Sequence, residues 1–319
     1  MTKPPEGLLL VDKPSGMTSH DVVNAVRRAF ATRKVGHAGT LDPLATGLLV
    51  VGIGRATRLL RFLSGLDKTY EGTARLGEER DTLDADGRVV RTAATGHVTE
   101  EKLREAMAGL VGESEQIPPA YSAVKVGGRS LHQAARRGER LEPRARPIRV
   151  DAFDLVSFDG RDLDFRVSCS SGTYVRVLIA DVGRSVESAA HLTRLVRTRV
   201  GPFSLSEARP LDAPGQPSPI EEAVRHLPSL TLDGVEARAA SHGRPLGPAA
   251  IEGPYAVRGP DGRLVAVYRD EHAKAVPEMV LAPAEVEVTS TRAPGPSPEN
   301  RTPGSRPPTG LLPGSRSRR

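Results

Sequence analysis

Apolar positions recur along the chain with two different periods. A continuous or alternating pattern, typical of strands, occupies five segments: residues 7–12, 47–53, 70–76, 149–154 and 163–169. A spacing typical of helices occupies residues 22–30, 98–110 and 174–186, and a short basic helix is predicted over 55–63. Thr18, Ser19 and Asp21 favour a helix start before Val22. The elements do not alternate regularly, so the pattern predicts an α+β fold with a mixed sheet.

Interruptions of this pattern divide the chain into three parts. The first domain is predicted to cover residues 1–225, and residues 116–148 interrupt it as an inserted arm with a proline pair and a glycine pair. A smaller strand-rich domain, punctuated by glycine and proline, is predicted over 226–289. Residues 290–319 are rich in proline, glycine and arginine and contain little apolar side chain, so we expect a disordered tail.

The net charge of +6 is concentrated in two places. The last 29 residues hold six arginines against one glutamate, which accounts for +5 of the total. The inserted arm and its flank hold eight basic residues: Lys125, Arg129, Arg136, Arg137, Arg140, Arg144, Arg146 and Arg149. Such an arm could contact phosphates. Charge alone does not separate that role from a solvated loop.

Other features of the sequence exclude whole classes of protein. Cys169 is the only cysteine, which rules out an internal disulfide and a cysteine-rich zinc site. The histidines lack metal-ligand spacing, the glycine pattern at 52–57 does not complete a dinucleotide-binding loop, and no apolar run approaches 18 residues. We therefore expect a cytoplasmic protein without a metal, a cofactor or a membrane span.

The stretch GHAGTLDPLATG, residues 36–47, holds a single carboxylate, Asp42. One interpretation is a capped helix start, with Asp42 as the N-cap and Pro43 as the first helical residue. The other is a reactive carboxylate, because Gly36, Gly39 and Gly47 would leave room around it for a bulky substrate. Composition and spacing leave both interpretations open.

Six motifs in a fixed order give the sequence a family resemblance. They are GLLLVDKPSGMTSHD, KVGHAGTLDPLATGLLVVGIGRATRL, DKTYEGTARLG, RDTLDADG, QIPPAYSAVKVGGR and CSSGTYVRVLIADVG. Together they span roughly residues 7–205, and they closely resemble the bacterial tRNA pseudouridine synthase B family. The resemblance implies an isomerase that converts uridine 55 in the TΨC loop of tRNA to pseudouridine. It also implies a pseudouridine synthase catalytic domain with a mixed sheet.

The same resemblance assigns the central carboxylate and its partners. It implies that Asp42 is catalytic, either as a nucleophile or as the base that starts glycosidic cleavage. Arg176 of GTYVR would lie against Asp42, favour its ionised form and keep its pKa low. Asp84 of TLDADG matches a carboxylate that shares this network, although the residues themselves favour a plain turn residue before Asp86 and Gly87.

Four further residues match those that handle the substrate base in the family. A uridine inside a folded loop must be flipped out before its glycosidic bond can be reached. Tyr70 resembles the tyrosine that stacks on the flipped base and is also proposed as a proton acceptor, and Tyr174 resembles the second wall of the pocket. Packing in the core is the alternative for both tyrosines. His37 matches a histidine that fills the space left by the base, and Leu195 matches an apolar contact to it.

The inserted arm resembles the family's thumb, which orders on tRNA. By this resemblance Lys125, Arg129, Arg136 and Arg137 contact the tRNA backbone, and residues 226–289 form a small PUA-like RNA-binding domain. We expect a monomer that binds the T-arm. A tRNA-folding chaperone that uses the same pocket without chemistry is the alternative function. A guide-RNA-dependent relative is the alternative within the enzyme class, and it would carry an N-terminal extension before the first strand at Gly7.

Overall fold

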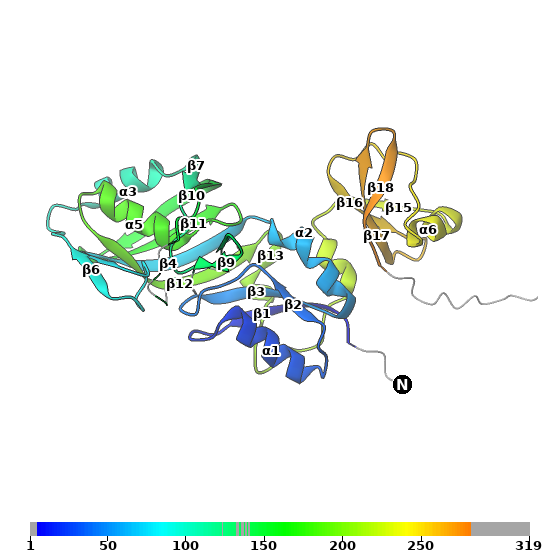
Figure 1. Cartoon of the computed structure of the whole chain (residues 1–319), viewed down its shortest axis with the longest axis horizontal. Helices are drawn as coiled ribbons and strands as arrows, with labels where there is room; N and C mark the ends of the chain where they lie inside the picture. The colour runs from blue at the N-terminus through cyan, green and yellow to red at the C-terminus, as the bar shows by residue number, and fades with distance from the viewer. Residues whose placement is uncertain are drawn as a thin grey trace, which may run out of the picture. The chain divides into compact units, whose positions relative to one another are not determined.

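A mixed sheet of ten strands forms the centre of the computed structural model (Figure 1). The structure describes residues 5–281, except for 123, 132, 133, 135, 136, 138 and 140. The predicted tail over 290–319 and the predicted contact Arg136 lie outside the described residues. The main strand order is β14 (Arg209–Pro210), β1 (Gly7–Lys13), β3 (Thr46–Ile53), β12 (Ala190–Val200), β4 (Lys68–Leu76), β11 (Asp162–Cys169), β10 (Arg146–Phe158) and β7 (Gly112–Gln116).

Two parallel pairs make this sheet mixed. β1 pairs parallel with β14 and β3 pairs parallel with β12, whereas the other neighbours in the order are antiparallel. β2 (Val35–Ala38) pairs with β3, and β13 (Phe203–Ser204) pairs with β12. The predicted α+β class with a mixed sheet is therefore confirmed.

Helices cover the sheet where the strands present apolar side chains. α3 (Glu100–Ala108) and α5 (Val175–Ser185) pack on β4, β10, β11 and β12 in one cluster, which includes Met107 and Ile179. α1 (Ser19–Ala29) packs Val22 and Val26 on Leu9 of β1, while the adjacent Leu8 belongs to a different cluster. Successive strand residues point to opposite faces, so β1 contributes side chains to a separate apolar core on each face of the sheet.

Residues 229–280 contain a second sheet of four strands. Its order is β15 (Ser229–Thr231), β16 (Pro254–Arg258), β17 (Leu264–Glu271) and β18 (Lys274–Val280). The strand-rich content predicted for this region is confirmed. The pattern missed α6 (Gly234–Ser241), whose N-cap Asp233 accepts hydrogen bonds from the main chain of Val235 and Glu236. A helix of eight residues carries too few apolar positions to show a period.

One helix prediction was wrong in detail. The predicted helix over 55–63 is a 3₁₀ turn, η1 (Gly54–Arg58), followed by the short α2 (Leu60–Ser64). Leu59 N–H donates to Ala56 C=O at 3.0 Å, an i to i−3 bond that tightens the backbone between the two pieces. The other elements among the described residues are β5 (Glu78–Arg80), β6 (Val89–Thr92), β8 (Lys125–Val126), β9 (Arg129–Ser130), η2 (Leu205–Glu207) and η3 (Ile220–Val224).

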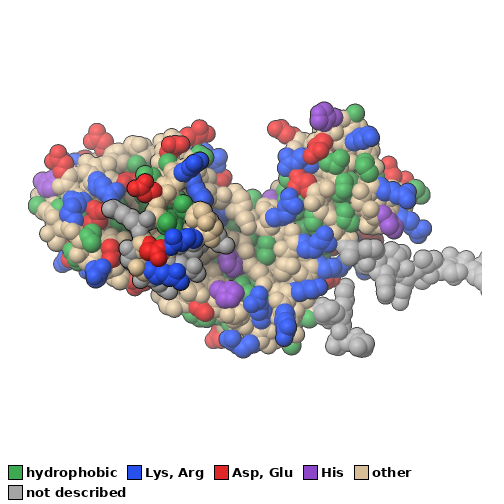
Figure 2. Space-filling model, viewed as in Figure 1, with side chains coloured by type: hydrophobic (Ala, Val, Ile, Leu, Met, Phe, Trp, Pro, Cys, Tyr) green, Lys and Arg blue, Asp and Glu red, His purple; other side chains and the backbone are tan. Residues whose placement is uncertain are grey.

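The surface carries charges of both signs (Figure 2). On the visible face, Lys and Arg side chains gather at the lower edge, over the region where Figure 1 places α1. Arg28, Arg33 and Lys34, at the end of α1 and in the loop after it, are exposed. Among the described residues, no helix is long and apolar enough to cross a membrane.

Candidate active site

Asp42 lies in the loop between β2 and β3, and this loop is not a helix start. The main chain makes a single turn, in which Ala45 N–H donates to Asp42 C=O at 3.1 Å, and β3 begins at Thr46. The capped-helix interpretation was therefore wrong. The physical reason is strand pairing. β3 pairs with β1 from Gly47 to Ile53, and this keeps the residues after Ala45 extended instead of helical. The Asp42 side chain stays 40% exposed and does not cap a helix.

The glycines of this loop do not simply leave room for a substrate, as the composition suggested. Gly47 is buried, with φ +93°, and a Cβ built on it would lie 2.5 Å from the carbonyl oxygen of Arg197. A Cβ on Gly36 would lie 3.0 Å from Leu60 Cδ1. Gly47 therefore permits the close approach of β3 and β12, and Gly36 permits packing against α2.

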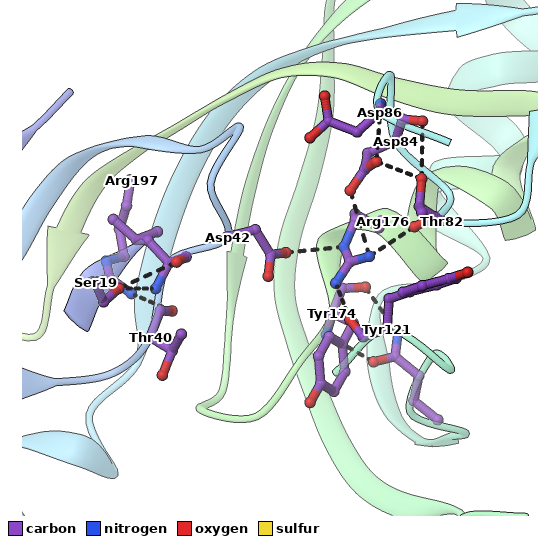
Figure 3. Close-up of polar contacts among 12 residues, drawn as sticks. Ser19, Thr40, Asp42, Thr82, Asp84, Asp86, Tyr121, Tyr174, Arg176 and Arg197 are labelled. Carbon is purple, nitrogen blue, oxygen red and sulfur yellow. Dashed lines mark hydrogen bonds and ion pairs between the residues drawn. The ribbon is translucent and has the colours of Figure 1, made fainter. Parts of the chain in front are cut away.

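Two buried polar side chains, Ser19 and Arg197, bond the main chain around Asp42 and lie near each other (Figure 3). Ser19 Oγ donates to Leu41 C=O at 3.2 Å and lies 2.8 Å from the Leu41 N–H, which donates to it. Arg197, 1% exposed, donates to the carbonyl groups of Gly39 at 3.0 Å and Leu48 at 2.8 Å. The residues before and after Asp42 are thus fixed to α1 and β12.

Lys13 supports the same loop from the end of β1. Its buried ammonium donates to the carbonyl groups of Pro14 at 2.9 Å, Met17 at 2.5 Å and Pro43 at 3.4 Å. Burial lowers the pKa of Lys13 to about 8, although the negative charge of Asp42 opposes the shift. Lys13 therefore holds main-chain carbonyls and contributes positive charge close to Asp42.

Arg176, in the first turn of α5, contacts Asp42 and three other groups (Figure 3). Its guanidinium is 4% exposed, and its Nε lies 2.9 Å from Asp42 Oδ2. One Nη donates to Thr82 C=O at 2.7 Å and lies 3.5 Å from Asp84 Oδ2, while the other donates to Tyr121 C=O at 3.0 Å. A buried charge with this many acceptors has little freedom to turn, so Arg176 presents a fixed edge to Asp42.

The expected low pKa of Asp42 was wrong in sign. Desolvation by burial raises the pKa of Asp42 above its ordinary value, and this exceeds the lowering by the Arg176 charge. The negative charge of Asp84 raises the pKa further, and Lys13 lowers it. The sequence identifies the charged partner but not the loss of water around the carboxylate, which depends on the folded surroundings.

Asp84 is both a turn residue and part of this charged cluster. It is 6% exposed, and its Oδ1 accepts hydrogen bonds from Thr82 Oγ1 at 2.5 Å and from the main-chain N–H of Asp86 at 3.2 Å. Its other oxygen faces Arg176. The two interpretations of Asp84 therefore describe the two oxygens of one carboxylate.

The residues expected to handle the base lie on both sides of Asp42. Tyr70 on β4 and Leu195 on β12 are 8% and 6% exposed and belong to one apolar cluster with Leu41. Tyr174 is half-buried and is the N-cap residue of α5, two positions before Arg176. His37 lies on β2, and its pKa is lowered by burial and then by the charge of Arg197.

Known proteins resemble this chain along most of its length. The N-terminal domain model of TruB family pseudouridylate synthase matches residues 27–175, and the model of tRNA pseudouridine synthase II, C terminal, matches 227–282. tRNA pseudouridine synthase B from a Mycobacterium species is 49% identical over 287 residues, which cover 87% of this chain and 97% of that protein. The Mycobacterium tuberculosis protein of the same name is 46% identical over 287 residues, covering 87% and 96%. The chain belongs to the TruB family.

A solved structure extends the comparison to the fold of this TruB-family protein. A chain in the structure of an H/ACA RNP bound to a substrate RNA containing 2'-deoxyuridine superposes with a TM-score of 0.67. The two chains are 26% identical, and the match covers 87% of this chain and 85% of that chain. The likeness supports the pseudouridine synthase fold assigned to the TruB-family chain.

The thumb segment of this TruB-family chain is described only in part. β8 and β9 form a short hairpin within it. Arg137 is exposed, while Arg129 forms an ion pair with Glu139. Lys125, the other residue predicted to contact the tRNA backbone, belongs to β8. The structure describes its main chain but not its side chain.

Sequence reasoning missed the residues that position the loop around Asp42. Ser19 was predicted only as part of a helix start, and the roles of Lys13 and Arg197 in the loop were not foreseen. The signal that pointed to Ser19 was genuine, because Thr18 caps α1 with a capping box that includes Asp21. The contact of Ser19 with Leu41 depends on tertiary packing, so no local sequence pattern predicts it.

Proposed function

We propose that this TruB-family protein isomerises uridine 55 in the TΨC loop of tRNA to pseudouridine. The observation that carries the proposal is the pair of Asp42 and the buried Arg176, 2.9 Å apart, with the carboxylate still 40% exposed. The reaction breaks the bond between uracil N1 and ribose C1′, turns the base and joins C5 to C1′. C5 loses a proton and N1 gains one, so no external reactant is consumed.

Asp42 is the group that starts this reaction. An ionised carboxylate can attack uracil C6 or ribose C1′ as a nucleophile, or remove a proton to assist cleavage through a glycal. All of these routes need the charged form. Arg176 and Lys13 lower the pKa of Asp42, although burial holds it above the ordinary value. The two basic residues thus favour the ionised form that the reaction needs, against the effect of burial.

The flipped base enters between Tyr70, Leu195 and Tyr174. Extrusion from the loop costs a few kcal/mol, and stacking on an aromatic ring returns about 1 to 3 kcal/mol per base. Burial raises the pKa of the Tyr70 phenol, so Tyr70 stays protonated at neutral pH. A neutral phenol is a weak proton acceptor, which favours stacking over acceptance of the C5 proton. His37 takes the space that the base leaves, and Asp84 supports Arg176.

Contacts to the tRNA backbone come from the thumb. Lys125, Arg129, Arg136 and Arg137 bind phosphates of the T-arm, and the protein works as a monomer in the cytoplasm. The relatives named tRNA pseudouridine synthase B support a tRNA substrate. The RNA-bound structure with a TM-score of 0.67 supports an RNA surface on this fold.

An unmodified tRNA transcript incubated with the purified protein tests the proposal. Chemical mapping should find pseudouridine at position 55 and nowhere else, and a transcript with cytidine at 55 should remain unmodified. Absence of pseudouridine together with faster refolding of the transcript would support the chaperone alternative instead.

The guide-dependent alternative has one observation in its favour, the likeness to the H/ACA RNP structure. The same transcript reaction decides it, because no guide RNA is present. We expect full conversion without a guide. The higher identity to proteins named tRNA pseudouridine synthase B, 49% against 26%, is the reason for that expectation.

A further inference from the structure

Gln116, the last residue of β7, makes a two-point contact with the main chain of Tyr174. Gln116 Nε2 donates to Tyr174 C=O at 3.2 Å, and Tyr174 N–H donates to Gln116 Oε1 at 2.8 Å. The side chain is 5% exposed. A primary amide offers a donor and an acceptor side by side, so Gln116 can bond the N–H and the C=O of the same residue, Tyr174.

This contact is made to the N-cap residue of α5. Tyr174 is the N-cap of α5, and no side chain caps the helix. In a capping box, the N-cap N–H is bonded by a residue of the same helix. Here Gln116, 58 positions earlier in the chain, bonds that N–H. The first turn of α5 is therefore fixed from outside the helix.

The first turn of α5 carries Arg176, whose Nε lies 2.9 Å from Asp42. A movement of Tyr174 would move Arg176, because only one residue separates them. Arg176 also donates to Tyr121 C=O at 3.0 Å. Gln116 and Tyr121 both belong to the entrance of the thumb, since Gln116 pairs with Arg146 across the β7–β10 ladder. The thumb therefore joins the charged site at two points.

We propose that Gln116 is a positioning residue for isomerisation, which clamps the Tyr174 main chain, sets Arg176 against Asp42 and couples the thumb entrance to the charged site. This inference rests on the proposed function. A small displacement of a reacting or supporting group is enough to lower a rate strongly. Gln116 touches no substrate atom in this account and acts through Arg176.

Replacing the amide by a shape-matched apolar side chain, Gln116→Met, tests the proposal. Single-turnover conversion of a tRNA transcript is measured with saturating enzyme, and the dissociation constant of the tRNA complex is measured separately. We expect the rate to fall at least about ten-fold, with the dissociation constant within about two-fold of wild type. We also expect the acid limb of the rate to move to higher pH, because a displaced Arg176 lowers the pKa of Asp42 less. Glu115→Ala, an exposed change on the same strand, is the matched control and should behave as wild type.

Three outcomes separate this inference from its alternatives. An unchanged rate in Gln116→Met overturns it. A raised dissociation constant with a normal rate at saturation also overturns it, since Gln116 would then serve only RNA binding. If Gln116→Met does not fold, Gln116→Glu, which keeps the acceptor for Tyr174 N–H but loses the donor, is measured by the same criteria. Failure of the wild type to form pseudouridine contradicts the proposed function itself and is seen before any variant is compared.

Discussion

At the scale of single residues, the site holds a carboxylate under two opposing influences. Burial raises the pKa of Asp42, and the charge of Arg176 lowers it by a smaller amount. The ionised form, which we take to be active, therefore dominates only above the ordinary range for an aspartate. A rate that depends on Asp42 should fall as pH decreases through this raised pKa.

Arg176→Gln should move that fall to higher pH. Removing the guanidinium removes a lowering influence, so the pKa of Asp42 rises further, and an arginine beside an aspartate is worth about one to three pH units. The single-turnover rate measured between pH 5 and 9 reports the shift. Arg184→Gln, on the same helix but paired with Asp181 and Glu79, is the control and should leave the profile in place. An acid limb that does not move in Arg176→Gln would show that the charge of Arg176 does not act on the reacting group.

Ser19→Ala should harm both stability and activity. The change removes the partner of Leu41 N–H in a buried position, and an unsatisfied buried group costs about 1 to 3 kcal/mol. We expect a loss of that size in the free energy of unfolding, measured by urea denaturation, and a lower single-turnover rate. Ser241→Ala removes an exposed hydroxyl that donates to Arg238 and should change neither. Equal effects of the two changes would argue against a role for Ser19 in holding the loop.

At the scale of elements, β3 and β12 lie in close parallel contact beside the loop that carries Asp42. Gly47 opposes Arg197 in this ladder, where a Cβ would meet main-chain atoms at 2.5 and 2.9 Å. A backbone oxygen and nitrogen cannot move aside as a flexible side-chain end would. The spacing of the two strands therefore depends on the absence of a side chain at Gly47. This spacing also sets the position of Arg197 beneath the loop.

Gly47→Ala should therefore cost more stability than its backbone angle alone explains. Gly160→Ala is the matched control, because Gly160 also has a positive φ, +95°, but a Cβ there would meet nothing within 4 Å. Left-handed backbone costs a non-glycine residue about 1 to 2 kcal/mol, and overpacking adds about 1 to 3 kcal/mol. Urea denaturation of both variants should show the larger loss in Gly47→Ala. Equal losses would mean that the strands can separate to admit the methyl group.

The sequence predicts those elements that are determined by residues close together in the chain. The α1 start at Thr18 and the helix at Val175–Ser185 follow from capping residues and apolar spacing. The turn at Asp42 did not follow, because Asp-Pro favours a helix start locally while pairing of β3 decides the outcome. The clamp of Gln116 on Tyr174 was equally out of reach, since 58 positions separate its partners and only the folded chain joins them.

At the scale of the whole molecule, the site forms only when distant segments meet. Asp42 belongs to the N-terminal part of the sheet, and Arg176 belongs to a helix 134 positions later. The basic residues of the thumb and of the adjoining β10 also differ in their surroundings. Arg149 is paired with Asp67 and Asp151, each at 2.7 Å, whereas Arg137 is exposed. Counting basic residues therefore overstates the charge available to RNA.

Arg137→Ala should weaken tRNA binding and Arg149→Ala should not. Each lost phosphate contact reduces the slope of log affinity against log salt by about one. Filter binding at several salt concentrations measures the slope for both variants. We expect a smaller slope for Arg137→Ala. We expect the wild-type slope for Arg149→Ala, because Asp67 and Asp151 already neutralise the charge of Arg149. The reverse order would mean that the ion pairs of Arg149 open when tRNA binds.

The central claim is that Asp42 performs the chemistry of isomerisation. Release of tritium from a tRNA transcript carrying C5-tritiated uridine measures this most directly, because C5 loses its hydrogen only when it becomes the carbon joined to ribose. The wild-type protein should release tritium equivalent to one uridine per tRNA. Asp42→Asn keeps the shape of the side chain but removes its charge, and it should bind tRNA and release none. Release by Asp42→Asn at the wild-type rate would contradict the account.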